Sequence, residues 1–192
     1  MSPGRAILGL WVLWALSWLA TASWSAKTER RVGIGREWAY RLVTAAGVIL
    51  FAVPAHRYEG YLRLWHVGWA GAWACVAFEA AGFAFCWWAR VHLGRLWSGN
   101  VTKKQDHHVV DTGPYALVRH PIYTGILLAV LAVVVAKGTA IGIVGAALIT
   151  AGLTMKARLE ETWLHSELGP PYDAYRQRVP MLIPFLRPRR RG

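Results

Sequence analysis

Long stretches almost free of charge constrain this chain more than any other feature of its sequence. Each is close to the roughly 20 residues that a helix needs to cross a bilayer. The clearest are residues 6–26, 64–89, 120–136 and 138–155, and residues 42–56 form a shorter candidate that contains Pro54. This spacing of charges predicts an all-α, polytopic integral membrane protein with about five transmembrane helices. We expect one membrane domain over residues 1–192, in which residues 156–192 form a C-terminal cytoplasmic segment.

The basic residues predict an orientation for these helices. The chain carries 22 Lys and Arg against 10 Asp and Glu, and 18 of the 22 lie in residues 25–41, 90–121 and 156–192. The positive-inside rule therefore places these three segments in the cytoplasm and the N-terminus outside. The excess of positive charge is explained by attraction to anionic lipid, so we expect membrane lipids and no nucleic acid as partners.

The first stretch also has a second interpretation. Arg5, an apolar run and the small residues Ala20, Thr21 and Ala22 are typical of a cleaved signal peptide. A retained helix is favoured because later spans can direct insertion, and because the run continues through Trp24 toward bilayer length.

Residues 64–89 hold two cysteines and one acidic residue. Cys75 and Cys86 are 11 positions apart, about 16 Å along one helix, so they cannot form a disulfide with each other. They also lack metal-ligand spacing, and no metal site is expected. Glu79 lies within a predicted span, where an ionisable residue is functional by default and a buried structural role is the alternative.

Small residues recur at helical spacing in the two stretches on either side of Lys137. They are Gly125, Ala129, Ala132, Ala136, Gly138, Gly142 and Ala146. Small side chains let helix backbones approach closely. We expect these two helices to form a tight hairpin, with dimerisation through Gly138 and Gly142 as the alternative.

Polar residues concentrate in a motif that leads into residues 120–136. Residues 113–125 read GPYALVRHPIYTG, preceded by GRLWS at 94–98. In the same order, Glu160, Glu161, Gly169, Tyr172, Tyr175, Val179, Pro180 and Pro184 follow downstream. Over residues 90–186 this arrangement resembles the isoprenylcysteine carboxyl methyltransferase family and the related phospholipid methyltransferases.

The resemblance implies a membrane methyltransferase that binds S-adenosyl-L-methionine between a cytoplasmic loop and the C-terminal helices. Its acceptor would be a lipophilic small molecule or a prenylated substrate that enters from the bilayer. The resemblance implies cofactor contacts at Asn100, His107, His108, Val109, Val110, Tyr115, His120, Pro121, Ile122, Tyr123 and Glu160. Lys156 and Arg119 are the candidate catalytic residues.

Lys156 departs from the family pattern. The family usually has Arg four positions before the glutamate, where it can meet the carboxylate of the substrate. Lysine keeps the charge but lacks the planar fork that grips a carboxylate. Carboxyl O-methylation stays favoured, while the identity of the acceptor, and whether O, N or S is methylated, is left open.

The physical chemistry of these residues suits such a cofactor. Pro121 begins a helix, so Arg119 and His120 lie at a helix N-terminus, and a carboxylate is expected there with His120 and neighbouring backbone N–H groups. Glu160 would accept from an ammonium group or a ribose hydroxyl. Glu161 points about 100° away on a helix and is expected to be an exposed, supporting charge.

Two other functions are compatible with the sequence. A membrane reductase of sterol or enone type would use NADPH, although Gly33-Ile34-Gly35 lacks the third glycine of a dinucleotide fingerprint. A non-catalytic accessory protein is the other alternative, which the intact motif disfavours. The 17 Arg against 5 Lys favour a bacterial inner membrane, with the cofactor site facing the cytoplasm. Oligomeric state is not predicted.

Overall fold

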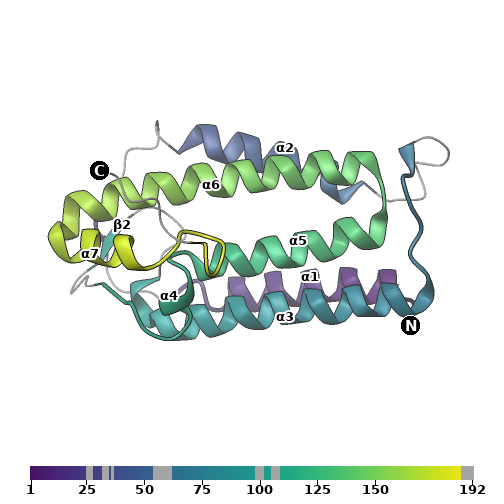
Figure 1. The fold of residues 1–192 in the computed structure, drawn as a ribbon, viewed down its shortest axis with the longest axis horizontal. Helices are drawn as coiled ribbons and strands as arrows, with labels where there is room; N and C mark the ends of the chain where they lie inside the picture. The colour runs from purple at the N-terminus through teal and green to yellow at the C-terminus, as the bar shows by residue number, and fades with distance from the viewer. Residues whose placement is uncertain are drawn as a thin grey trace.

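The computed structural model describes residues 1–24, 28–31, 35, 37–53, 62–97, 102–104 and 109–186. It confirms the all-α fold. The five long helices are α1 (Pro3–Ala20), α2 (Trp38–Ala52), α3 (Trp69–Leu93), α5 (Pro121–Lys137) and α6 (Ala140–Leu168) (Figure 1). The short elements are the 3-10 turn η4 (Gly94–Leu96), α4 (Pro114–Leu117), α7 (Pro170–Arg178) and the strands β1 (Thr28–Arg31) and β2 (Thr102–Lys104).

Three of the helices have the length and hydropathy to cross a membrane. They are α1, α3 together with η4, and α6, while α2 and α5 are apolar helices of 15 and 17 residues. Helix bounds differ from the predicted spans. In particular, α3 begins at Trp69 because Gly68 before it is extended, and α6 continues without a break to Leu168. The exact spans therefore stay a prediction.

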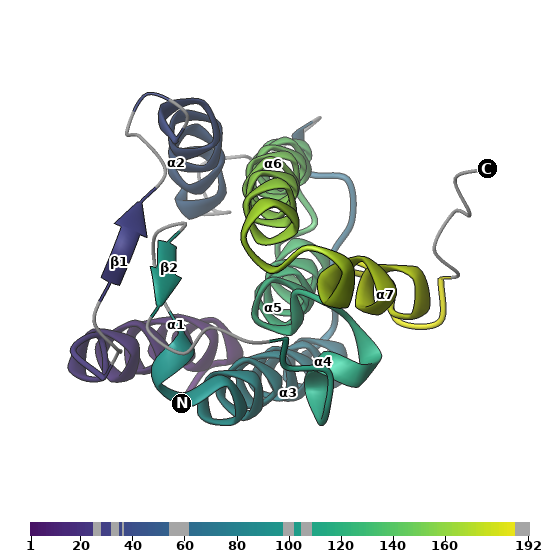
Figure 2. The same ribbon diagram turned by 90° about the vertical axis from the view of Figure 1, so that its left-hand side faces the viewer.

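The long helices pack in two close pairs. A short turn at Gly138 joins α5 to α6, as the predicted hairpin requires, but the closest packing of each is with another helix. Helix α3 packs against α5 and α2 against α6, whereas α5 and α6 meet over a smaller area (Figure 2). Gly82 and Gly125 let α3 and α5 touch backbone to backbone, and Gly47 and Gly145 do so for α2 and α6. The small residues thus serve contacts between helices that are distant in sequence.

Arg90, on the last turn of α3, joins that helix to the end of α1. Its side chain is fully buried and donates hydrogen bonds to the carbonyl oxygens of Gly94 at 2.7 Å, Trp24 at 2.6 Å and Thr21 at 3.2 Å. The guanidinium also lies 4.7 Å from the ring of Trp24 and 4.4 Å from that of Trp97. These carbonyls and rings compensate the desolvation of the buried cation.

The chain turns back on itself after α6. Gly169 ends α6 with a φ of 59°, which favours glycine, and Pro170 then occupies the first turn of α7. Beyond α7, the Pro180 carbonyl accepts from the Arg119 N–H at 2.8 Å. The segment after α7 is therefore attached to the start of α5. The β1–β2 ribbon lies between α1 and α2 at the same end of the molecule (Figure 2).

Candidate functional site

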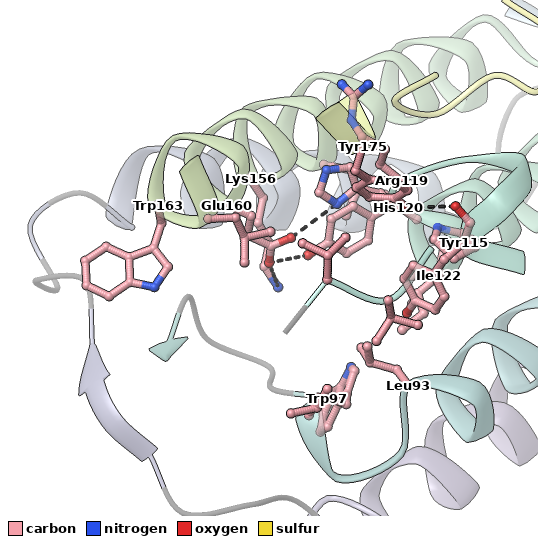
Figure 3. Close-up of a pocket in the computed structure, with 18 of the residues that line it drawn as sticks. Leu93, Trp97, Tyr115, Arg119, His120, Ile122, Lys156, Glu160, Trp163 and Tyr175 are labelled. Atoms are coloured by element: carbon pink, nitrogen blue, oxygen red, sulfur yellow. Dashed lines mark hydrogen bonds and ion pairs between the residues drawn. The ribbon is translucent and has the colours of Figure 1, made fainter. Parts of the chain in front are cut away.

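A cavity of about 490 Å³ opens at this end of the bundle, bounded by α1, α3, α4, α5, α6 and α7 (Figure 3). One part of its wall is polar and the other is aromatic and aliphatic. The lining residues are Trp14, Trp18, Leu19, Ala22, Leu93, Leu96, Trp97, Val109, Val110, Tyr115, Arg119, His120, Pro121, Ile122, Tyr123, Ile126, Leu153, Lys156, Glu160, Trp163, Leu164, Leu168, Tyr172 and Tyr175.

Every predicted site residue that the structure describes lines this cavity. They are Val109, Val110, Tyr115, Arg119, His120, Pro121, Ile122, Tyr123, Lys156 and Glu160. The other three, Asn100, His107 and His108, lie outside the described residues. The fold thus brings together residues from three separate parts of the sequence, and their roles in binding stay a prediction.

Local backbone geometry places the motif residues at the cavity. Gly113 has a φ of 56° and turns the chain into α4, whose first residue is Pro114. The Tyr175 hydroxyl donates to the carbonyl oxygen of Tyr115 at 2.7 Å and so ties α7 to α4. Pro121 then starts α5, as the sequence predicted.

Glu160 is the centre of the polar wall. Its Oε1 accepts a hydrogen bond from the Tyr123 hydroxyl at 2.6 Å and lies 3.9 Å from Lys156 Nζ. The Nδ1 of His120 is 3.4 Å from the other carboxylate oxygen. The rings of His120 and Tyr123 are stacked, with centroids 5.4 Å apart and planes within 4°. Lys156 and His120 therefore stabilise a carboxylate that faces the cavity.

Arg119 has a different set of partners. Its Nε and Nη2 lie 2.7 and 2.5 Å from Glu161 Oε1, and its Nη1 donates to the carbonyl oxygens of Arg176 and Val179. The prediction that Glu161 is an exposed charge is wrong, because this residue is only 9% exposed. The guanidinium is committed to holding α6 and α7 against the start of α5. Arg119 also lines the cavity, and its predicted catalytic role stays a prediction.

Two of the backbone N–H groups near the predicted anion site at the start of α5 are taken up by the chain itself. The N–H groups of Arg119 and His120 donate to the carbonyl oxygens of Pro180 and Met181, at 2.8 and 3.1 Å. The sequence showed a helix N-terminus but not the distant segment that occupies its donors. These two N–H groups are therefore not available to a bound carboxylate.

Three buried donors in the cavity wall lack a hydrogen-bond partner within the described parts of the chain. They are the indole N–H groups of Trp14 and Trp163 and the hydroxyl of Tyr172. The indole nitrogen of Trp163 points toward the cavity in Figure 3. Burial raises the pKa of Tyr172, so its hydroxyl stays protonated and able to donate. A ligand with suitably placed acceptors would satisfy these groups.

Trp163 was not among the predicted site residues, although a sequence signal for it exists. Lys156, Glu160 and Trp163 follow each other at spacings of four and three, which place them on one face of α6. Once Glu160 is assigned to a cavity, the same face predicts Trp163.

Glu79 lies outside this cavity. Its side chain is fully buried, and both carboxylate oxygens are without a partner in the described structure. Cys75 and Cys86 are both free, buried thiols. Among the described residues, no group of three His, Cys, Asp or Glu side chains is arranged to hold a metal ion.

Comparison with known proteins finds several relatives. Residues 75–166 match the isoprenylcysteine carboxyl methyltransferase family. The chain is 33% identical over 101 residues to a protein-S-isoprenylcysteine O-methyltransferase of Schizosaccharomyces pombe, covering 51% of this chain and 43% of that protein. It is 43% identical over 77 residues to methanethiol S-methyltransferase 2 of Bradyrhizobium diazoefficiens, covering 40% and 29%.

A third relative matches a larger part of the chain. The nickel-cobalt-cadmium resistance protein NccN of Alcaligenes xylosoxydans xylosoxydans is 27% identical over 173 residues, covering 83% of this chain and 67% of that protein. By contrast, the chain spans less than half the length of the two methyltransferases. The matches to both methyltransferases are therefore matches to part of each protein.

Proposed function

The resemblance of this chain to the isoprenylcysteine carboxyl methyltransferase family is confirmed over residues 75–166, and we propose that the chain is an integral membrane methyltransferase that uses S-adenosyl-L-methionine. The observation that carries the proposal is the composition of the cavity wall. A charged cluster around Glu160 and an apolar wall with Trp14 and Trp18 share one cavity. A polar cofactor and a lipid-like acceptor can therefore meet in it.

The residues present fit the cofactor. A volume of about 490 Å³ is in the range of small-molecule sites. Glu160 would accept from the ammonium group or a ribose hydroxyl, and Tyr123 and Tyr115 offer ring faces. The unpartnered donors of Trp163 and Tyr172 would bind the acceptor atoms of the cofactor. In this assignment, the bound cofactor would provide the hydrogen-bond partners that these buried donors lack.

The bound cofactor would supply a methyl group activated by a positively charged sulfur. The side chains then have two tasks, to position the acceptor and to exclude water. Lys156 Nζ lies 5.4 Å from the centre of the Tyr123 ring, next to the charged cluster, where it would hold an acceptor carboxylate. An ionised carboxylate is already nucleophilic, so no general base is required.

The acceptor is, in our proposal, a lipophilic carboxylate that enters from the bilayer and is methylated on oxygen. One observation favours a thiolate as a second candidate. Lys156 provides a point charge instead of the fork that grips a carboxylate, and one relative bears the name of a methanethiol S-methyltransferase. A thiolate is likewise nucleophilic without a base.

The proposed location is the bacterial inner membrane, with the cavity open to the cytoplasm. Segment 90–121 and the segment from residue 156 onward both contribute to the cavity and are rich in Lys and Arg. The positive-inside rule supports this orientation.

Methyl transfer from a cofactor labelled in its methyl group tests the proposal. Purified protein in nanodiscs is incubated with a bacterial lipid extract, and Glu160→Gln serves as the control. We expect label in the lipid fraction with the wild type and at least a tenfold lower rate with the variant. Base releases labelled methanol from a carboxyl methyl ester but not from a thioether, which separates the two acceptors. Absence of both transfer and cofactor binding would contradict the proposal.

A further inference from the structure

A second, larger cavity lies on the opposite faces of α5 and α6. It has a volume of about 1860 Å³ and is lined in part by residues of the segment after α7. On α6, Thr150, Thr154 and Arg158 line this second cavity, while Lys156 and Glu160 line the first. Helical periodicity separates the two sets, and Arg119 and Glu161 stand at the boundary between them. The second cavity is therefore a separate groove, which we call the α5–α6 groove.

One part of the α5–α6 groove is apolar. Leu127, Leu128 and Leu131 project into it from α5, and Ile183 and Leu186 line it from the segment after α7. Leu131, Ile183 and Leu186 are 52%, 61% and 61% exposed, although they are large hydrophobic side chains. Exposed apolar side chains on a membrane protein are suited to contact with acyl chains.

The other part of the α5–α6 groove is strongly positive. Four arginines and one acidic residue line the groove, and they are Arg119, Arg158, Arg176, Arg178 and Glu161. Arg119 is paired with Glu161, and Arg178 is paired with Asp111 at 2.9 Å. Arg158 and Arg176 form no ion pair within the described residues. Among the residues that the structure describes, the groove thus has two positive charges without a counter-ion, beside an apolar wall.

We propose that the α5–α6 groove binds an anionic glycerophospholipid. Its phosphate would lie at Arg158 and Arg176, and its acyl chains along Leu127 and Leu131. Basic pockets between transmembrane helices bind lipid headgroups through such charge pairing. The site is independent of the methyl acceptor and does not require the proposed enzymatic activity.

Native mass spectrometry of the full chain released from detergent tests this site with two lipids, phosphatidylglycerol and phosphatidylcholine. The double variant Arg158→Gln with Arg176→Gln removes the two free charges. Arg95→Gln is the matched control, because Arg95 is an exposed arginine on η4 that lies outside the groove. We expect phosphatidylglycerol to bind the wild type and Arg95→Gln equally, and the double variant at least tenfold more weakly.

A third variant, Leu131→Trp, tests the apolar part by filling it without changing charge, and it should also reduce phosphatidylglycerol binding. Thermal stability in lipid-free detergent, measured for every variant, shows that each is folded. Phosphatidylglycerol should raise the melting temperature of the wild type but not that of the double variant. Equal binding of both lipids to the wild type, or unchanged phosphatidylglycerol binding to the double variant, would overturn the proposal.

Discussion

The adjacent residues Glu160 and Glu161 have different partners because neighbouring side chains on a helix point about 100° apart. Glu160 faces the first cavity and accepts a hydrogen bond from Tyr123, while Glu161 pairs with Arg119 on the other side of the helix. His120 contacts both carboxylates, at 3.4 Å from Glu160 and 3.3 Å from Glu161. Glu160 is thus placed to contact a ligand, and Glu161 is placed to hold α6 against the start of α5.

Replacement of Glu160 should affect the cofactor more than the fold. Glu160→Gln keeps the shape of the side chain but removes the charge, so a charge-assisted hydrogen bond worth about 1.5 to 3 kcal/mol is lost. We expect cofactor affinity to fall by about ten- to a hundredfold. Isothermal titration calorimetry in nanodiscs measures this, and a change below twofold would place the cofactor elsewhere.

Replacement of Glu161 should mainly lower stability. Glu161→Gln leaves the Arg119 guanidinium, whose side chain is 8% exposed, without its counter-charge. An unpaired buried charge costs several kcal/mol, and the contact between α6 and the start of α5 depends on this pair. We expect Glu161→Gln to lower the melting temperature, measured by fluorescence-detected unfolding. This decrease should be larger than the decrease caused by Glu160→Gln. A larger decrease in melting temperature for Glu160→Gln than for Glu161→Gln would contradict the structural role of Glu161.

Trp163 provides a test of the unpartnered donors. Trp163→Phe keeps an aromatic ring in the wall but removes the indole N–H, and it should weaken cofactor binding severalfold if that group binds an acceptor atom. Trp88→Phe is the matched control, because Trp88 is 49% exposed on α3 and lies outside the cavity. Equal affinity in both variants would show that Trp163 only packs.

The closest contacts between the helices are made at glycines, which have no side chain to keep the two backbones apart. A Cβ atom built on Gly125 would lie 2.5 Å from the carbonyl oxygen of Gly82 and 2.6 Å from Cys86 Sγ. Cys86 itself donates to the carbonyl of Ile122 at 3.3 Å. Helices α3 and α5 are therefore close enough to fix the cavity wall that both of them build.

Alanine at this position should separate the two helices. We expect Gly125→Ala to destabilise the protein by about 1 to 3 kcal/mol through overpacking, which thermal unfolding in detergent would show. Gly9→Ala is the control, since nothing lies within 4 Å of a Cβ atom there, and alanine favours a helix. It should leave the melting temperature unchanged or raise it. A Gly125→Ala melting temperature equal to wild type would mean that the helices can shift apart freely.

The elements could largely be predicted from sequence, and their partners could not. Charge spacing predicted the apolar helices, and Pro121 and Gly169 marked where α5 begins and α6 ends. The small residues of α5 predicted close packing but did not say against which helix. Likewise the motif placed Tyr123 and Glu160 at one site through the family resemblance, while the pairing of Arg119 with Glu161 depends on rotation of α6, which periodicity alone does not set.

The first cavity lies at one end of the molecule, and the orientation in the membrane decides which compartment that end faces. The exposed Ser166 of α6 is a reporter of that end. In a chain with Cys75→Ala and Cys86→Ala, we expect Ser166→Cys to react with an impermeant maleimide only after spheroplasts are permeabilised. Ser2→Cys, at the predicted outer end, should react in intact spheroplasts. Labelling of Ser166→Cys from outside would invert the predicted topology.

The attachment of residues 180–182 to the start of α5 has a consequence for the order in which the protein is made. A ribosome synthesises α5 well before Pro180 and Met181, whose carbonyls accept from the N–H groups of Arg119 and His120, the two residues before that helix. The contact that fixes the start of α5 can therefore form only after the segment that follows α7 has been translated.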